Sequence, residues 1–143
     1  MKNLIIILGI LGAIVVLTVI LFLIRIPNFE PQITKVELRS EHYNESLFIK
    51  KKIWGITADH QVIIITKSND AVVEPKIEYD YVYEGMLPFY YQFKDDTLKL
   101  FVRKESNIPN KLSTNIKIVQ IILNNTEMMN LTKTYIEKNL TTL

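Results

Sequence analysis

The first hydrophobic pattern in the chain is an unbroken apolar run over residues 4–24, which contains no charged residue and no proline. A helix of this length spans about 30 Å, the thickness of a bilayer's hydrocarbon core. Signal-peptide cores are shorter and end in small residues, whereas this run ends in Leu-Phe-Leu-Ile. The pattern therefore predicts an uncleaved transmembrane anchor over residues 1–25. The protein is expected to cross the cell membrane once and to contact the bilayer through residues 4–24.

A proline-containing stem is predicted for residues 26–32, because Pro27 and Pro31 both restrict the backbone there. Two criteria give opposite orientations for the part that follows. Arg25, Lys35 and Arg39 favour a cytoplasmic C-terminus by the positive-inside rule. An apolar run at the extreme N-terminus is, however, read as an export signal, and long domains translocate largely regardless of charge. We expect an extracytoplasmic domain, and the cytoplasmic alternative stays open.

After the stem the hydrophobic period becomes two, which is typical of β-strands with one buried face. We expect residues 33–143 to form a single globular domain of mainly β (α+β) class. Short turns join the strands, so they should form an antiparallel, sandwich-like meander of about six or seven strands. The expected strands are residues 33–39, 46–54, 61–67, 76–84, 89–94, 97–103 and 115–123.

The period changes again near the C-terminus. Met128, Leu131, Tyr135 and Ile136 fall at i, i+3, i+7 and i+8, which places them on one helical face. Asn125 or Thr126 can cap the start of this helix, and Glu127 suits its first turn. We expect a C-terminal helix that ends near Asn139 and covers one face of the sheet.

Composition and charge remove several classes of function. The chain has 17 basic and 15 acidic residues, and Lys2 precedes the apolar run, so the remainder is nearly neutral. A nucleic-acid partner is not expected, because such proteins carry a basic stripe. The basic run Lys50–Lys52 is interpreted as a solvated strand that resists aggregation. The chain has no cysteine, which excludes disulfides and thiolate metal sites.

Two acid–histidine pairs are candidates for catalysis or metal binding. His42 follows Glu41, and His60 follows Asp59. Such pairs can orient a base or ligate a metal, but no third ligand has a recognisable spacing. We therefore assign no catalytic residue, metal ligand or cofactor. A membrane-anchored hydrolase or metal-dependent enzyme that uses His60 and nearby carboxylates is kept as the alternative function.

Aromatic residues give two further candidates. Tyr79, Tyr81 and Tyr83 alternate along one expected strand, and packing inside the sheet explains them better than a ligand platform does. The segment 54–61, Trp-Gly-Ile-Thr-Ala-Asp-His-Gln, is the most individual part of the chain. Trp54, Asp59 and His60 form a candidate recognition edge. Hairpin chemistry, with an unusual dihedral angle at Gly55, is the other interpretation.

The same segment resembles a Trp-Gly-x-Thr-x-Asp-His-Gln hairpin of uncharacterised small membrane-anchored proteins from Bacteroidota-type bacteria. The resemblance implies a bacterial membrane protein, but it implies no activity and no site residues. Together with the anchor and the scarcity of reactive groups, it favours a non-enzymatic envelope module. Such a module would bind a partner protein, associate with itself or support an assembly at the membrane.

Overall fold

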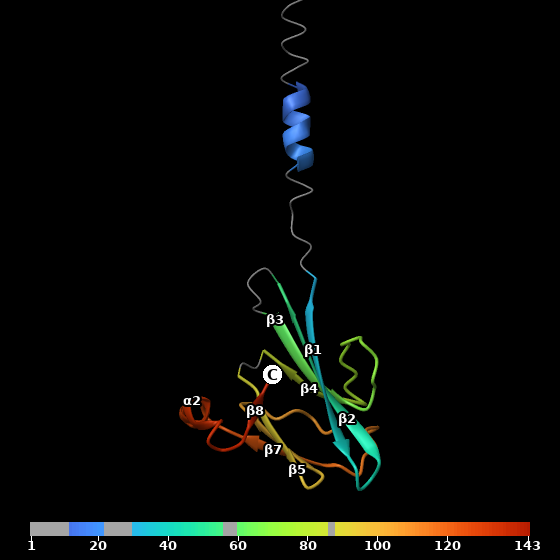
Figure 1. Ribbon diagram of the computed structural model, residues 1–143, viewed down its shortest axis with the longest axis vertical. Helices are drawn as coiled ribbons and strands as arrows, with labels where there is room; N and C mark the ends of the chain where they lie inside the picture. Colours follow the sequence, from blue (N-terminus) through green and yellow to red (C-terminus); the bar gives the residue numbers. More distant parts are fainter. Residues whose placement is uncertain (1–11, 22–29, 56–59, 86–87) are drawn as a thin grey trace, which may run out of the picture. The chain divides into compact units, whose positions relative to one another are not determined.

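The computed structural model describes residues 12–21, 30–55, 60–85 and 88–143. The chain divides into two compact units, Met1–Glu30 and Pro31–Leu143. In the first unit, residues 12–21 are helical and their side chains are exposed (Figure 1). Across the described ranges, no helix combines the length and the apolar character needed to cross a bilayer. The other positions of the predicted run, 4–11 and 22–24, lie outside the described residues.

The described part of the second unit contains eight strands in two four-stranded sheets. The first sheet has the order β1-β2-β3-β4 and is antiparallel throughout. The second sheet has the order β7-β6-β5-β8. The strands of the first sheet are β1 (Gln32–Ser40), β2 (Glu45–Trp54), β3 (His60–Thr66) and β4 (Tyr81–Glu84), and those of the second are β5 (Tyr90–Lys94), β6 (Thr97–Val102), β7 (Lys117–Ile122) and β8 (Thr141–Thr142). The prediction of a mainly β domain is confirmed.

The predicted meander is wrong at one connection, because β6 and β7 are parallel. Thr97 pairs with Lys117, so the start of β7 lies beside the start of β6. Residues 103–116 therefore cross from the end of one strand back to the beginning of the next. Their return end is held by the first sheet: the Glu45 carboxylate accepts hydrogen bonds from the Thr114 hydroxyl and, at 3.0 Å, from the Asn115 N–H.

The expected strand over residues 76–84 is also too long, since only β4 is extended. The N–H groups of Tyr79 and Asp80 both donate to the Lys76 carbonyl oxygen at 2.8 Å, which closes a turn. The Asp80 carboxylate accepts the Lys76 N–H at 2.9 Å and stabilises the same turn. Tyr79 is consequently 47% exposed, whereas Tyr81 and Tyr83 enter the core.

The core lies between the inner faces of the two sheets. Alternate residues of the central strands are fully buried there, as period-two patterning requires. The first sheet contributes Leu47, Ile49, Ile63 and Ile65, and the second contributes Leu98 and Leu100. The rings of Tyr83 and Phe89 are tilted against each other with centroids 5.5 Å apart. The packing interpretation is confirmed for Tyr81 and Tyr83 but is wrong for the exposed Tyr79.

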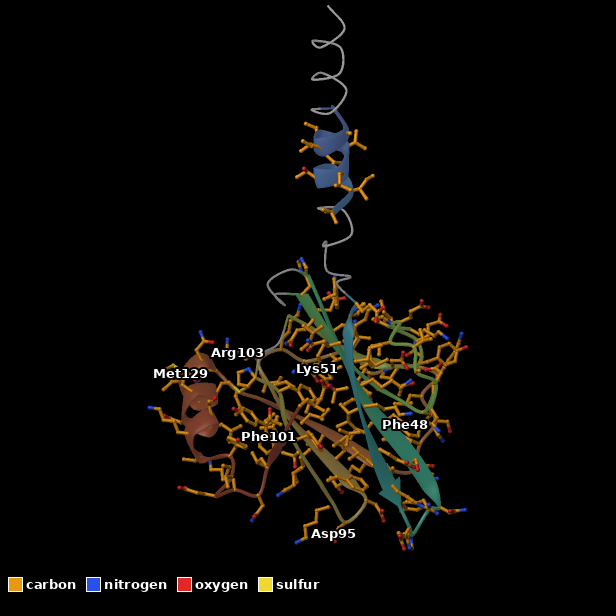
Figure 2. The ribbon with its side chains drawn as sticks, turned by 45° about the horizontal axis from the view of Figure 1, so that its top comes forward. Phe48, Lys51, Asp95, Phe101, Arg103 and Met129 are labelled. Atoms are coloured by element: carbon orange, nitrogen blue, oxygen red, sulfur yellow. The ribbon has the colours of Figure 1, made fainter. Side chains whose placement is uncertain are left out.

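The predicted C-terminal helix is present as α2 (Asn125–Thr134). Its N-cap is Asn124 rather than Asn125 or Thr126, and Asn124 and Glu127 form a reciprocal capping box. Met128 and Leu131 pack with Tyr90 on the outer face of the second sheet, so the expected cover is confirmed. Met129 points to solvent (Figure 2). The helix ends earlier than predicted, and Ile136 is 72% exposed rather than packed.

Candidate functional site

The predicted recognition edge is partly assembled in the structure. Trp54 ends β2 and His60 begins β3, and the two residues are direct partners in the register. Their rings are stacked, with centroids 5.8 Å apart and an interplanar angle of 28°. Trp54 is 40% exposed, and the Lys52 ammonium lies 5.8 Å from its ring centroid. Asp59 lies outside the described residues.

The backbone at Gly55 supports the hairpin interpretation of this segment. Gly55 has a φ of 97°, a backbone conformation that side-chain-bearing residues rarely adopt. The glycine therefore allows the chain to leave β2 at this point. The stacked Trp54–His60 pair is then also a cross-strand pair that stabilises the hairpin.

A metal centre receives no support from the part of the chain that the structure describes. Within it, no three histidine, aspartate or glutamate side chains gather closely enough to hold a metal ion. His42 packs edge-on against Tyr43, with centroids 4.6 Å apart.

The prediction of a solvated lysine run is wrong for two of its three members. Lys50 and Lys51 are only 1% and 7% exposed. Their side chains point to opposite faces of β2, Lys50 to the outer face of the first sheet and Lys51 to the inner one. Burial of an ammonium group is unfavourable unless hydrogen-bond acceptors compensate it. Each lysine donates to at least one acceptor that lies 20 or more positions away in the sequence.

Lys51 extends among the core side chains between the sheets (Figure 2). Its ammonium donates to the main-chain oxygen of Leu143 at 2.9 Å. Burial lowers the pKa of the Lys51 amine, because the desolvated site disfavours the charged form. The contact joins the inner face of the first sheet to the segment that follows β8.

Lys50 is compensated by the segment 67–80, which lies beside the first sheet (Figure 1). The Lys50 ammonium is 2.5 Å from Asp70 Oδ1 and 3.4 Å from the Val72 carbonyl oxygen. The hydrogen bond from Lys50 lowers the pKa of the Asp70 carboxyl group. Val73, from the same segment, packs on Val62 and Ile64 of β3.

An open pocket of about 530 Å³ lies between this segment and the outer face of β2 and β3. Lys50, Ile64 and Thr66 come from the sheet, and Lys111 and Leu112 from the crossover between β6 and β7. The remaining lining residues belong to the covering segment: Lys67, Ser68, Asp70, Val72, Glu74, Lys76, Tyr79 and Asp80. The pocket thus combines charges of both signs with apolar and aromatic surface.

Most charged groups of the pocket are already engaged. Besides the Lys50–Asp70 pair, Lys67 donates to the Ser113 carbonyl oxygen at 2.8 Å, and Lys111 pairs with Glu78 while lying 5.3 Å from the Tyr79 ring centroid. Within the described part of the chain, the side chains of Glu74 and Lys76 make no hydrogen bond or close ion pair, and Lys76 acts on the Asp70 carboxylate only at longer range. One carboxylate and one ammonium are therefore available to a ligand.

Sequence reasoning did not find this pocket. Its only sequence signal was the polar break at Ser68-Asn69-Asp70, which indicates a turn but not what the turn covers. Comparison with protein-family models, curated proteins and solved structures finds no match for this chain.

Proposed function

We propose that this chain is a non-enzymatic module of the cell envelope, tethered to the membrane by residues 4–24, that binds a partner protein. The pocket on the outer face of β2 and β3 is the observation that carries the proposal. Its volume falls in the range of ligand sites. The site has an engaged lysine at its floor and apolar and charged groups at its rim, and none of these groups forms a recognisable nucleophile–base pair.

The chemistry of the rim favours a polypeptide segment as the occupant. Val72 is 53% exposed and Tyr79 is 47% exposed, so both offer apolar surface. The unengaged side chains of Glu74 and Lys76 can pair with charges of either sign on a partner. Apolar contacts surrounded by complementary charges are typical of protein–protein interfaces.

Site-specific photocrosslinking in native membranes tests the partner. A photoreactive residue in place of Val72 should give one discrete adduct with a protein that mass spectrometry can identify. Lys76→Glu or Glu74→Lys in the same chain should abolish that adduct, because each reverses a charge at the rim. The matched controls are Lys99→Glu, on the outer face of β6, and a photoreactive residue at Ile136. An adduct that survives both rim reversals, or that forms equally from position 136, would contradict the proposal.

The tether has its own test. The full-length chain should stay in the membrane pellet after alkaline carbonate washing, and its N-terminal sequence should begin before residue 4. Lys introduced at both Val16 and Leu17 should release it, because each charge at the bilayer centre costs about 3 kcal/mol. Release of the unaltered chain, or a mature N-terminus beyond Arg25, would refute the anchor. A reporter fused to the C-terminus would determine on which side the domain lies.

A further inference from the structure

Four side chains from two neighbouring cross-strand rungs lie on the outer face of the first sheet, at the end where β1 begins, and one rung continues through Val62 to Glu84. Ile33 pairs with Lys52, and Trp54 pairs with His60. Direct partners share a face, as do residues two apart along a strand, so all four side chains lie on the same side of the sheet. We call Ile33, Lys52, Trp54 and His60 the stem-side row. Figure 1 shows the first residues of β1 and β3 at this same end.

From this row we infer that the domain rests against the anionic lipid headgroups of the membrane that holds the chain. The inference rests on the proposed tether. Only residues 25–31 separate the apolar run from β1. Seven residues span at most about 25 Å when fully extended, and two of these are proline. In a tethered chain the start of β1 therefore stays close to the bilayer surface.

The exposed groups of the row suit this surface. Tryptophan concentrates at the headgroup level of membranes because its ring is apolar and its N–H is polar. Trp54 is 40% exposed and Ile33 is 48% exposed, so both have apolar surface to contribute. The Lys52 ammonium beside the indole provides attraction to anionic lipid.

The tether explains why so small a row is sufficient. One lysine and two apolar side chains would bind a vesicle weakly from free solution. Attachment to the same membrane makes the contact intramolecular, at a high effective concentration of lipid. The two buried lysines, Lys50 and Lys51, take no part, so the contact depends on Lys52 rather than on a broad basic patch. The pocket lies further along β2 and β3 and remains open to a partner.

The experiment uses Trp54 as its probe, because the chain contains one tryptophan. The full-length protein is reconstituted into phosphatidylcholine vesicles with and without phosphatidylglycerol. With phosphatidylglycerol, Trp54 emission should shift to shorter wavelength and should be quenched by lipids brominated close to the headgroup. Lys52→Gln should reduce the difference between the two vesicle types, and Ile33→Ser should reduce quenching in both. Lys99→Gln, on the outer face of β6, is the matched control and should change neither.

Two results would overturn the inference, and they differ from each other. In the first, the chain still pellets with carbonate-washed vesicles, but Trp54 emission changes neither with lipid composition nor with brominated lipid. This result refutes the headgroup contact and leaves the tether intact. Release of the chain from the vesicles by carbonate refutes the tether and the contact together.

Discussion

At the scale of single residues, Lys50 carries a buried charge at the floor of an open pocket. The cost of removing an ammonium group from water is several kcal/mol, and it is offset only by close and well-directed acceptors. Asp70 and the Val72 carbonyl oxygen supply them. Asp70 is itself 52% exposed, so water reaches the carboxylate but not the ammonium. Because only the ammonium is buried, substitutions of Lys50 and of Asp70 should differ in their effect on stability.

We expect Asp70→Asn to destabilise the domain, because it leaves a buried ammonium without its counter-charge. Adding Lys50→Met should recover most of the loss, since methionine can pack on Ile64 without any charge to compensate. Urea unfolding of the full-length chain in detergent measures both effects. Glu78→Gln is the control: it breaks an exposed pair with Lys111 and should cost less than about 1 kcal/mol. A double variant no more stable than Asp70→Asn would contradict this account.

The Lys50–Asp70 pair should make the stability of the domain depend on pH. Its partner lowers the pKa of Asp70 below 3.8, so the folded state binds the proton less readily than the unfolded chain does. The contribution is therefore complete above about pH 4 and is lost as the pH falls through the lowered pKa. The stability difference between the wild type and Asp70→Asn should be constant from about pH 5 to 8 and should shrink below pH 4. A difference that stays constant in acid would show that Asp70 does not stabilise through its charge.

Residue-level burial was the part of the structure least accessible from the sequence. Lysine is among the residues least often buried, so three in succession predict a solvated surface. The prediction fails for Lys50 because Asp70 and Val72 cover it, and for Lys51 because Leu143 reaches it from the far end of the domain. The geometry of a strand does predict that Lys50 and Lys51, as successive residues, point to opposite faces of the sheet. It does not predict that other parts of the chain cover both faces.

At the scale of elements, the turn between β5 and β6 was predicted and has a specific geometry. Lys94 pairs with Thr97, so Asp95 and Asp96 form a two-residue loop. Both have positive φ, 48° and 54°, as a type I′ hairpin turn requires. Aspartate tolerates this conformation, but glycine adopts it without a steric penalty.

Asp96→Gly should accordingly stabilise the domain by roughly 0.5 to 1 kcal/mol. The shift in the urea midpoint of the full-length chain measures it. Lys99→Gly is the matched control in the strand that follows: there glycine only weakens extended backbone, so it should destabilise by a similar amount. Equal effects of both substitutions would mean that the turn conformation is not the cause.

The elements that were predicted well share a local pattern, and those predicted wrongly do not. β6 alternates between core and surface over its own length, whereas β2 and β3 are unbroken extended runs that are buried on both faces. In each case the local sequence was enough to locate the strand. Residues 76–80 alternate equally well, yet the Asp80 carboxylate closes them into a turn. Glu45 contributes to the parallel placement of β7 because its carboxylate accepts a hydrogen bond from Thr114, which lies 69 positions later in the chain. No local pattern encodes such a contact.

At the scale of the whole domain, a polar network connects the two sheets beside their shared core. The Tyr83 hydroxyl of β4 donates to Gln120 Oε1 of β7 at 2.6 Å. The same oxygen accepts the Ser106 N–H at 2.8 Å, and Gln120 Nε2 donates to the Ser106 carbonyl oxygen at 2.9 Å. The Ser106 hydroxyl in turn accepts the Val82 N–H at 2.8 Å. Ser106 of the crossover thus binds both sheets: it accepts the Val82 N–H at the edge of the first sheet and is hydrogen-bonded to Gln120 in the second.

Gln120 is the centre of this network, so its removal should cost more than removal of any one partner. Tyr83→Phe deletes one donor while Gln120 Oε1 keeps the Ser106 N–H, and should cost about 1 kcal/mol. Gln120→Leu leaves the Tyr83 hydroxyl, the Ser106 N–H and the Ser106 carbonyl oxygen without their partner, and should cost at least about 2 kcal/mol. Burial raises the pKa of the Tyr83 phenol, so it remains a donor.

The double variant separates the network from simple packing. In the Tyr83→Phe background no phenol hydroxyl remains to be left unpaired, so Gln120→Leu should cost less there than in the wild type. Unfolding midpoints of the four chains give the coupling directly. Additive effects, or a Tyr83→Phe loss as large as that of Gln120→Leu, would mean that this network does not help to join the sheets. The crossover, and with it the parallel placement of β7, would then need another source of stability.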